Sequence, residues 1–219
     1  MKKLLVFAIL LGCQTPQPSP TPTPPPETKA AVVWLNGTNA RCAMYFAAIS
    51  NMRRQGYEVR CPESRNTGSG TECLGEIDKL WAQGYRKIGV AGHSQGGGGS
   101  FACAYRAEQK YKAEFPVIGV QPAHGMNLVG GVRRIYPQIK SPSFQWHGSR
   151  DNLVSKQWVG SGYNALAAEK YWLEAVGARH VPVPTQWINE SIVFFDWKLK
   201  GESEEAFKKL VNKPTWGKP

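Results

Sequence analysis

The stretch KIGVAGHSQGGGG, residues 87–99, decides the fold of this 219-residue chain. Its first part, Lys87–Ala91, is an apolar run that predicts a buried strand, and a helix is predicted over Gly96–Tyr111. Between them the pattern Gly-x-Ser-x-Gly predicts a very sharp turn with Ser94 at its apex, because only small flanking residues allow such a turn. Glycines inside a helix each cost up to about 1 kcal/mol relative to Ala. We therefore expect the four consecutive glycines to let this helix pack very closely onto a sheet.

Short apolar runs alternate with helical patterns on both sides of this turn. Further strands are predicted at Ala30–Leu35, Tyr57–Cys61, Pro116–Val120, Ser143–Trp146 and Tyr171–Val176. Helices are predicted at Arg41–Gln55, Thr71–Gln83 and Ile188–Leu199. The alternation predicts an α/β fold, namely a three-layer α/β/α sandwich around a mostly parallel sheet of about six core strands. Only about twenty residues separate Val120 from Ser143, so no large lid is expected there.

The composition is that of one folded domain, because 42% of the residues are hydrophobic and 20% are charged. No apolar run reaches the roughly 18–20 residues of a spanning helix, which excludes an integral channel or transporter. The formal net charge is +11, but the positive charge is dispersed and no nucleic-acid-binding motif is found. No nucleic-acid partner is therefore expected. Histidine patterns such as His-Glu-x-x-His are absent from the sequence, so no metal is expected.

The amino-terminal segment is predicted to direct the protein to a compartment rather than to fold. Lys2 and Lys3 precede the apolar run Leu4–Leu11, which predicts a secretory signal peptide over residues 1–12. The ending Leu10–Cys13 resembles a bacterial lipobox, which implies cleavage before Cys13 and lipidation of its thiol; the alternative is a plain signal peptide with an incidental cysteine.

The segment that follows Cys13 is rich in proline. In residues 16–26, seven of eleven residues are proline, which favours an extended tether. Residues 13–29 are therefore expected to link a lipid anchor in the membrane to a folded domain, residues 30–219. This organisation predicts an exported, membrane-anchored lipoprotein of the bacterial cell envelope.

Four cysteines remain for the folded domain if Cys13 carries lipid: Cys42, Cys61, Cys73 and Cys103. An even number of cysteines in an exported protein predicts disulfides, with three possible connectivities. We favour the pair Cys61 and Cys73, because it closes the shortest loop, although the spacing leaves the other pairings open. No pair has Cys-x-x-Cys spacing, so a redox motif or a zinc ribbon is not supported.

A serine nucleophile needs a base, and the base needs an acid that orients it. For a serine on such a turn the expected order along the chain is serine, acid, histidine. Asp151 follows the predicted strand Ser143–Trp146, which places it at the same carboxyl edge of the sheet as Ser94. Only His180 comes after this acid; the earlier histidines are His93, His124 and His147. Asp196 fits less well because it follows His180. The predicted catalytic triad is therefore Ser94, Asp151 and His180.

An acyl-transfer site also needs two backbone N–H groups that stabilise the developing oxyanion. The residue after the nucleophile supplies one of them, which predicts the amide of Gln95. The loop after the first strand supplies the other, and Thr38 is the predicted donor, with Asn39 as the alternative.

Several segments together resemble the α/β-hydrolase superfamily. They are Val33–Thr38, Asn66–Gly70, GHSQGG at 92–97, GSRD at 148–151 and GARH at 177–180. The most similar branch is the group of small lidless enzymes that contains dienelactone-hydrolase-like esterases, cutinases and polyester hydrolases. The resemblance extends from about Ala30 to Leu210 and implies ester hydrolysis through an acyl-enzyme without a cofactor.

The resemblance also assigns positions within the site. Thr38 and Gln95 fall where the family has its oxyanion residues. His124 falls near a substrate-flanking position that polyester hydrolases usually fill with Trp, a departure that argues against a polyester substrate. Dienelactone hydrolases proper use a cysteine nucleophile, whereas this chain has Ser94.

The expected function is that of a serine esterase acting on a small-molecule or polymeric ester at an open, shallow site. Trp146, Trp158 and Tyr163 are candidates to border the acyl pocket, although such residues more often belong to the core. The sequence leaves two alternatives open, an acyltransferase with the same triad and a binding lipoprotein on a hydrolase scaffold. A monomer is expected, while the natural substrate is not predicted.

Overall fold

A twisted sheet of six parallel strands is found in the part of the chain that the computed structural model describes, residues 29–124, 132–183, 186–202 and 204–211. The strands are β1 Ala30–Leu35, β2 Glu58–Arg60, β3 Lys87–His93, β4 Val117–Val120, β5 Ser143–Gly148 and β6 Lys170–Ala175. Their order across the sheet is β2-β1-β3-β4-β5-β6, and every neighbouring pair is parallel. The predicted fold class, an α/β sandwich with about six core strands, is confirmed.

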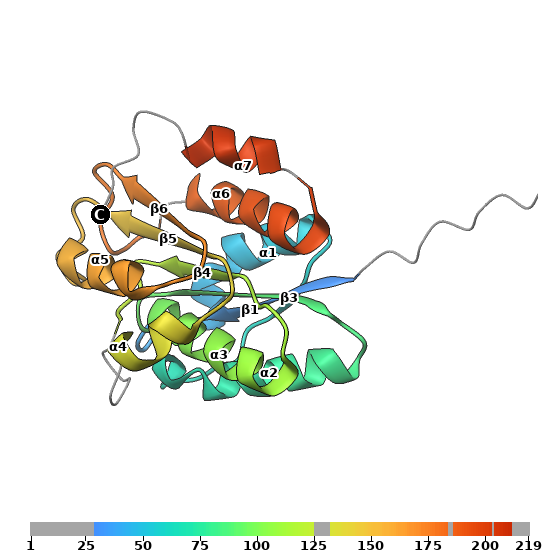
Figure 1. The fold of residues 1–219 in the computed structure, drawn as a ribbon. Coiled ribbons are helices and arrows are strands. Elements are labelled where there is room, and N and C mark those ends of the chain that lie inside the picture. Colours follow the sequence, from blue (N-terminus) through green and yellow to red (C-terminus); the bar gives the residue numbers. More distant parts are fainter. Residues whose placement is uncertain (1–28, 125–131, 184–185, 203, 212–219) are drawn as a thin grey trace, which may run out of the picture.

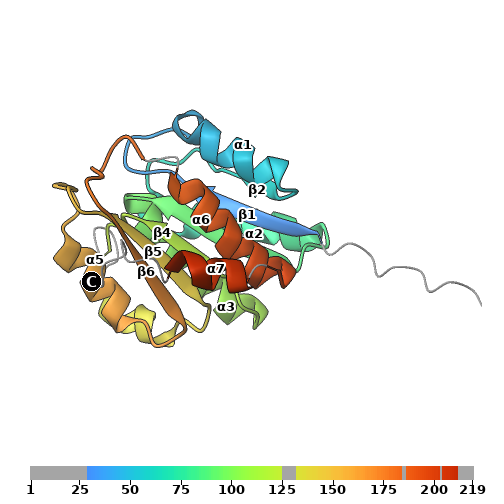
Figure 2. The ribbon, with the colours of Figure 1, turned by 90° about the horizontal axis from the view of Figure 1, so that it is seen from above.

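Helices cover both faces of the sheet (Figures 1 and 2). One face carries α1 Phe46–Arg54, α6 Gln186–Phe195 and α7 Glu204–Val211; the other carries α2 Thr71–Ala82, α3 Gln95–Tyr111, α4 Val132–Ile135 and α5 Lys156–Ala165. Shorter helical turns are η1 Cys42–Tyr45, η2 Thr67–Ser69, η3 Tyr136–Gln138 and the π-helical turn η4 Asp196–Lys200. Parallel strands need such crossover helices, which is why both faces of the sheet are covered.

Strand β1 shows how the sheet serves two hydrophobic cores. All six of its residues are buried. Val32 and Trp34 pack with α1 and α6, whereas Val33 and Leu35 pack with α2 and α3. Because successive side chains of a strand point to opposite faces, a continuous apolar run is the pattern of a strand that is buried on both sides.

Several elements differ in extent from the prediction. The helix predicted over Arg41–Gln55 begins as the 3-10 turn η1 and becomes α-helical at Phe46, and the helix predicted over Ile188–Leu199 ends in the π-helical turn η4. Helices α5 and α7 were not predicted. The predicted signal peptide, Cys13 and the proline-rich tether lie outside the described residues. So does part of the segment between β4 and β5, whose described part holds the short turns α4 and η3.

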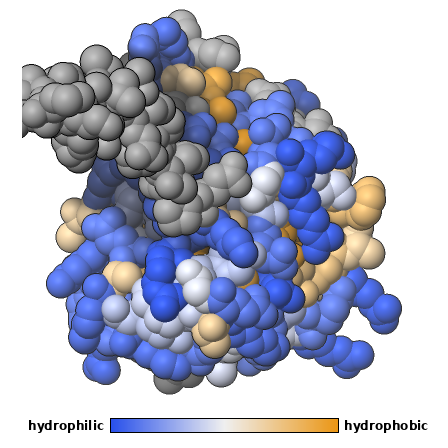
Figure 3. All heavy atoms as spheres, turned by 90° about the vertical axis from the view of Figure 1, so that its right-hand side faces the viewer, coloured by the Kyte–Doolittle hydropathy of each residue, from blue (hydrophilic) through white to orange (hydrophobic). Residues whose placement is uncertain are grey.

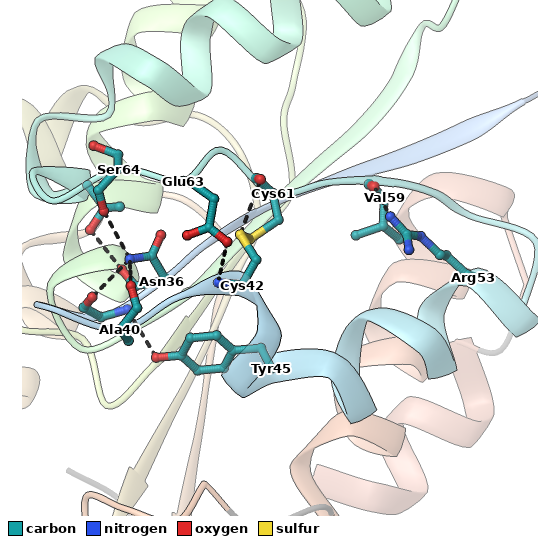
Figure 4. Close-up of a disulfide and its surroundings, with 11 residues drawn as sticks. Asn36, Ala40, Cys42, Tyr45, Arg53, Val59, Cys61, Glu63 and Ser64 are labelled. Carbon is teal, nitrogen blue, oxygen red and sulfur yellow. Dashed lines mark hydrogen bonds between the residues drawn. A yellow bond between two sulfur atoms is a disulfide. The ribbon is translucent and has the colours of Figure 1, made fainter.

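The two disulfides join neighbouring elements rather than the nearest cysteines in sequence. Cys42 pairs with Cys61, and Cys73 pairs with Cys103, with Cα–Cα distances of 6.0 and 5.9 Å. The favoured pairing of Cys61 with Cys73 was therefore wrong. Cys61 follows β2 at the sheet edge where η1 begins with Cys42 (Figure 4), whereas Cys73 lies on α2 and faces α3. Loop length says little about which side chains the folded sheet brings together.

All six strands point the same way, so the sheet has an amino edge and a carboxyl edge. The chain enters β1 at the amino edge, on the right of Figure 1, and the carboxyl ends of the strands lie on the left. Figure 3 views the molecule from the amino edge, where hydrophilic residues predominate. A depression of about 620 Å³ at this edge is lined mainly by charged and polar side chains. None of the described helices is both long enough and apolar enough to cross a membrane.

Candidate active site

Ser94 occupies the sharp turn between β3 and α3. Its backbone torsions are φ 55° and ψ −119°, in a region that costs a non-glycine residue about 1–3 kcal/mol. Three hydrogen bonds hold this conformation: the Ser94 amide donates to Val120 O at 2.9 Å, and the Ser94 carbonyl accepts from the amides of Gly98 at 3.0 Å and Ala123 at 2.9 Å. The turn therefore fixes Ser94 at the carboxyl edge of the sheet, half-buried and next to a pocket.

The glycines around Ser94 are required by close approach of backbone to backbone. A Cβ atom on Gly92 would lie 2.3 Å from the carbonyl oxygen of Gly96, and one on Gly96 would lie 2.3 Å from that of Leu35. A Cβ atom on Gly99 would lie only 1.9 Å from the carbonyl oxygen of Thr67. The glycine run therefore lets α3 approach the sheet and the η2 turn, which is the reason inferred from the sequence.

Asp151 and His180 form a buried pair beside this turn. Asp151 lies three residues beyond β5, and His180 lies in the loop that follows β6. His180 Nδ1 is 2.8 Å from Asp151 Oδ2, and the two side chains are 8% and 0% exposed. The other carboxylate oxygen of Asp151 accepts hydrogen bonds from the amides of Leu153 at 2.9 Å and Val154 at 3.0 Å. With Nδ1–H donated to the carboxylate, Nε2 of a neutral His180 is left free to accept a proton.

Ser94 and His180 line the same pocket, which has a volume of about 440 Å³. Its other lining residues are Gly37, Thr38, Asn39, Ala40, Met44, Tyr45, His93, Leu153, Val154 and Val181. Most of this lining is apolar, and three apolar side chains at its rim, Met44, Leu153 and Val181, are 70%, 66% and 54% exposed. Such a surface suits an apolar group of a ligand that reaches Ser94 directly from solvent.

The loop after β1 forms one wall of this pocket and is held in place by the buried side chain of Asn36. Asn36 Nδ2 donates to the carbonyl oxygens of Gly37 at 3.0 Å, Ala40 at 2.6 Å and Ser64 at 3.0 Å (Figure 4). The hydroxyl of Thr67 donates to the carbonyl oxygen of Asn36 at 2.8 Å. The Asn36 amide group therefore joins this loop to the segment that contains Ser64.

Thr38 of this loop lines the pocket, and Gln95 is the first residue of α3; their backbone amides are the predicted oxyanion donors. Neither amide donates to a backbone carbonyl in the part of the chain that the structure describes. Asn39 also lines the pocket and has a positive φ of 56°. The amide of Gln95 carries the partial positive charge of a helix N-terminus, which favours negative charge nearby.

A chain of hydrogen bonds beneath the pocket connects the loop after β1 with the loop that carries His180. The Gly37 amide donates to the Tyr45 hydroxyl at 3.0 Å, and this hydroxyl lies 2.9 Å from His93 Nδ1. His93 Nε2 lies 3.2 Å from the carbonyl oxygen of His180 and 3.3 Å from Gln121 Oε1. Because both of these are acceptors, Nε2 carries the proton and Nδ1 accepts from Tyr45.

The two titratable side chains in these hydrogen bonds, His93 and Tyr45, stay neutral at ordinary pH. Burial, with a smaller contribution from the nearby His180, lowers the pKa of His93 to about 4. Burial also raises the pKa of Tyr45. Sequence reasoning placed His93 in the turn without a role and did not single out Tyr45, Asn36 or Gln121. An Asn-Gly pair directly after a buried strand was the available signal for Asn36, whereas nothing in the sequence links Tyr45 to His93.

His124 and Trp146, the residues predicted to flank the substrate, do not line the pocket of Ser94. His124 is 6% exposed, and its ring nitrogens contact the Tyr136 hydroxyl at 2.5 Å and Gln145 Oε1 at 2.8 Å. Trp146 is 1% exposed and belongs to the core on the α1 and α6 side of the sheet. His124 follows β4 and Trp146 lies on β5, and both side chains are buried in the interior.

The other two aromatic candidates also lie away from Ser94. Trp158 is on α5 and is 48% exposed, but it does not line the pocket. Tyr163 packs edge to face on Trp172, with ring centroids 5.7 Å apart, in a small cluster under α5. The pocket wall is instead made by the loops after β1, β5 and β6.

Comparison with known proteins bears on the fold. A crystal structure described as a predicted CIB-like hydrolase from Thermoplasma acidophilum is similar to this chain, with a TM-score of 0.57 and 18% sequence identity. The similarity covers 77% of this chain and 86% of that one. The chain has the α/β-hydrolase fold. No protein-family model and no curated protein matches its sequence.

Within the α/β-hydrolase fold, the structure brings Ser94, Asp151 and His180 to one edge of the sheet, where Thr38 and Gln95 also lie. Among the described residues, no group of three or more His, Cys, Asp or Glu side chains is arranged to hold a metal ion.

Proposed function

We propose that the protein is a serine hydrolase that cleaves carboxylic esters through an acyl-enzyme. The observation that carries the proposal is the buried pair of His180 and Asp151, 2.8 Å apart, whose histidine lines the same pocket as Ser94. The backbone amides of Leu153 and Val154 hold the Asp151 carboxylate in place against the imidazole of His180, as an orienting acid requires.

In this proposal each group has one role. Ser94 Oγ attacks the ester carbonyl while His180 Nε2 takes its proton, and the amides of Thr38 and Gln95 stabilise the oxyanion. His180 then gives the proton to the leaving alcohol, and the acyl group stays on Ser94. Water, activated by the same imidazole, releases the acid and restores the serine. The strained turn at Ser94 supports this role, because strain is retained where a reacting side chain must be held in place.

The apolar lining of the pocket favours ester substrates whose acyl part is a hydrocarbon chain. Each methylene that becomes buried contributes about 0.8 kcal/mol, which corresponds to roughly fourfold in kcat/KM until the pocket is filled. An acyltransferase would use the same groups and deliver the acyl chain to an alcohol instead of water.

We also propose export and anchoring through a lipidated Cys13, as inferred from the sequence. The described chain starts at the amino edge of the sheet, whereas Ser94 lies at the carboxyl edge.

The test is hydrolysis of p-nitrophenyl esters from acetate to palmitate by wild-type protein and by Ser94→Ala. Serine-dependent turnover that rises from acetate to butyrate supports the proposal, and a competing alcohol in the assay distinguishes hydrolysis from acyl transfer by its products. Ser100→Ala is a matched control, because Ser100 is buried in α3 and its hydroxyl only bonds backbone carbonyls. Equal activity of Ser94→Ala and wild type would contradict the proposal.

A further inference from the structure

A second depression adjoins the pocket of Ser94. It has a volume of about 450 Å³ and is lined by Arg150, Asn152, Leu153, Arg179, His180 and Val181. Leu153, His180 and Val181 also line the pocket of Ser94, so the two depressions share a wall that includes the imidazole of His180. We call this second depression the arginine subsite.

The two arginines that line the subsite are exposed, and neither forms a salt bridge with a carboxylate in the part of the chain that the structure describes. Arg150 directly precedes Asp151, and Arg179 directly precedes His180. Two arginines without a carboxylate partner among the described residues therefore line one depression, and each directly precedes a member of the acid–base pair.

The backbones of both arginines are fixed. The Arg150 amide donates to the carbonyl oxygen of Ala178 at 2.9 Å, which joins the loop after β5 to the loop after β6. The carbonyl oxygen of Arg179 accepts from Gln121 Nε2 at 2.7 Å. The two side chains thus start from anchored positions on adjoining loops, which lowers the entropy lost when both bind one group.

The two depressions differ in character. The pocket of Ser94 is mainly apolar, whereas the lining of the subsite includes two arginines and Asn152. Guanidinium groups bind carboxylates and phosphates through paired, charge-assisted hydrogen bonds. We propose that the arginine subsite receives an oxyanionic group, a carboxylate or a phosphate, carried by the alcohol part of the ester substrate. This inference rests on the proposed function.

His180 lies between the two depressions, and its position indicates that the oxyanionic group belongs to the alcohol part of the ester. In the proposed reaction the imidazole gives its proton to the leaving oxygen, so that oxygen must lie next to His180. The acyl carbonyl oxygen faces Thr38 and Gln95 instead. The alcohol therefore extends past His180 toward Arg150 and Arg179, while the hydrocarbon acyl chain stays in the apolar pocket.

A third depression, on the other side of the pocket, provides the contrast. It is lined by Asn39, Ala40, Arg41, Glu63, Ser64 and Arg65. It also holds two arginines, but here the carboxylate of Glu63 offsets part of their charge. Arg65 is exposed and forms no salt bridge among the described residues. Arg65→Gln therefore removes one unpaired charge near the site without touching the arginine subsite.

The test compares p-nitrophenyl butyrate with 3-carboxy-4-nitrophenyl butyrate, which has the same acyl chain and one added carboxylate on the alcohol. For wild type we expect kcat/KM to be about tenfold higher for the anionic ester at low salt, and the ratio to approach one as ionic strength rises. Arg150→Gln and Arg179→Gln each lower the ratio about threefold, and the double variant brings it to about one. Using the ratio cancels any effect of these substitutions on the adjacent Asp151 or His180.

Controls separate this inference from the proposed function. Arg65→Gln should keep the wild-type ratio, and an equal loss in Arg65→Gln would show diffuse charge and overturn the subsite. Serine-dependent hydrolysis of both esters with a wild-type ratio of one or less overturns the subsite alone. Absence of serine-dependent hydrolysis of either ester overturns the proposed function and the inference with it. Inorganic phosphate and acetate, added as competitors, show which oxyanion lowers the ratio more strongly.

Discussion

The hydroxyl of Tyr45 lies 2.9 Å from Nδ1 of His93, and this hydrogen bond is the link between the two walls of the pocket. On one side the same hydroxyl accepts from the amide of Gly37, next to Thr38. On the other side His93 contacts the carbonyl oxygen of His180 at 3.2 Å. The amide proposed for the oxyanion and the imidazole proposed as base are therefore positioned relative to each other by two buried, neutral side chains.

Tyr45→Phe removes this link and keeps the ring, which packs against Trp34 with centroids 5.2 Å apart. We expect kcat to fall about tenfold with little change in KM, because small displacements of reacting groups lower the rate more than they weaken binding. The free energy of unfolding should fall by about 1–3 kcal/mol, since the buried Gly37 amide and His93 Nδ1 lose their partner. Steady-state kinetics and urea denaturation measure the two effects.

Tyr105→Phe is the control for this prediction, because the Tyr105 hydroxyl bonds the side chain of Gln138 at the surface. It should leave both kcat and stability close to wild type. If Tyr45→Phe loses stability but keeps its full kcat, Tyr45 has a structural role only and the positioning role is refuted.

Asp151→Asn should lower kcat by about four orders of magnitude near neutral pH. An amide in place of the carboxylate no longer holds the Nδ1–H tautomer of His180, which leaves Nε2 unable to act as a base. Asp196→Asn is the control: Asp196 Oδ1 accepts from Tyr57 on the far part of the fold at 2.7 Å, so this variant should retain kcat within a few-fold. The same loss in both variants would point to unfolding rather than to the triad, which circular dichroism would reveal.

The positions of Ser94, Asp151 and His180 relative to the strands illustrate what can be predicted from the sequence. The order of Ser94, Asp151 and His180 along the chain and the apolar runs before them were enough to predict strands that end at one edge. Parallel strands bring their carboxyl ends together, so residues far apart in sequence meet there without any further information. This topology places the loops of Asp151 and His180 side by side, and in the structure their side chains are 2.8 Å apart.

The direction of individual side chains could not be predicted in the same way. His124 follows β4 near the site, yet its ring turns inward and bonds Gln145 at 2.8 Å. A Cβ atom on Gly162 would lie 2.1 Å from His124 Cδ2, so α5 packs directly on this ring. The two glycines at 160 and 162 also hid α5 in the sequence, because glycine disfavours helices in isolation and only tertiary contact explains their presence. Helix α7 was missed because a single buried residue, Phe207, anchors its eight residues.

Acid should destabilise the fold through two buried histidines. Burial lowers the pKa of His93 and of His124 to about 4, whereas an unfolded histidine titrates near 6.5. Between these values the unfolded chain binds more protons than the folded one, so the free energy of unfolding falls as the pH is lowered from about 6.5 to about 4. Each imidazole contributes about 1.4 kcal/mol per pH unit in this window, or about 3 kcal/mol over the whole window, so the two together contribute about 7 kcal/mol.

Urea denaturation at several pH values between 7.5 and 4 measures this slope. His124→Gln should reduce the dependence of the free energy of unfolding on pH by the contribution of one imidazole. Tyr136→Phe is the matched control, because it removes the hydroxyl that contacts His124 Nδ1 but no imidazole. It should therefore lower stability and keep the wild-type slope. Identical slopes in wild type and His124→Gln would show that His124 does not carry this pH dependence.

The two disulfides should contribute similarly to stability but differently to activity. Each closes a loop of roughly 20–30 residues, for which constraint of the unfolded chain contributes about 3–4 kcal/mol. Cys42 begins the turn that follows the Thr38 loop, and the nearby Asn36 side chain bonds the carbonyl oxygens of Ala40 and Ser64 (Figure 4). Cys73 and Cys103 join α2 to α3, away from the pocket.

Replacing both members of the first pair, Cys42→Ser with Cys61→Ser, should therefore lower the free energy of unfolding and also kcat, because the loop that presents Thr38 loses a constraint. Replacing Cys73 and Cys103 should lower the free energy of unfolding by a similar amount while kcat at 25 °C stays near wild type. Peptide mapping of the oxidised protein checks the pairing itself, and a Cys61–Cys73 peptide would contradict it. Equal loss of kcat in the two double variants would show that the first disulfide has no special connection to the Thr38 loop.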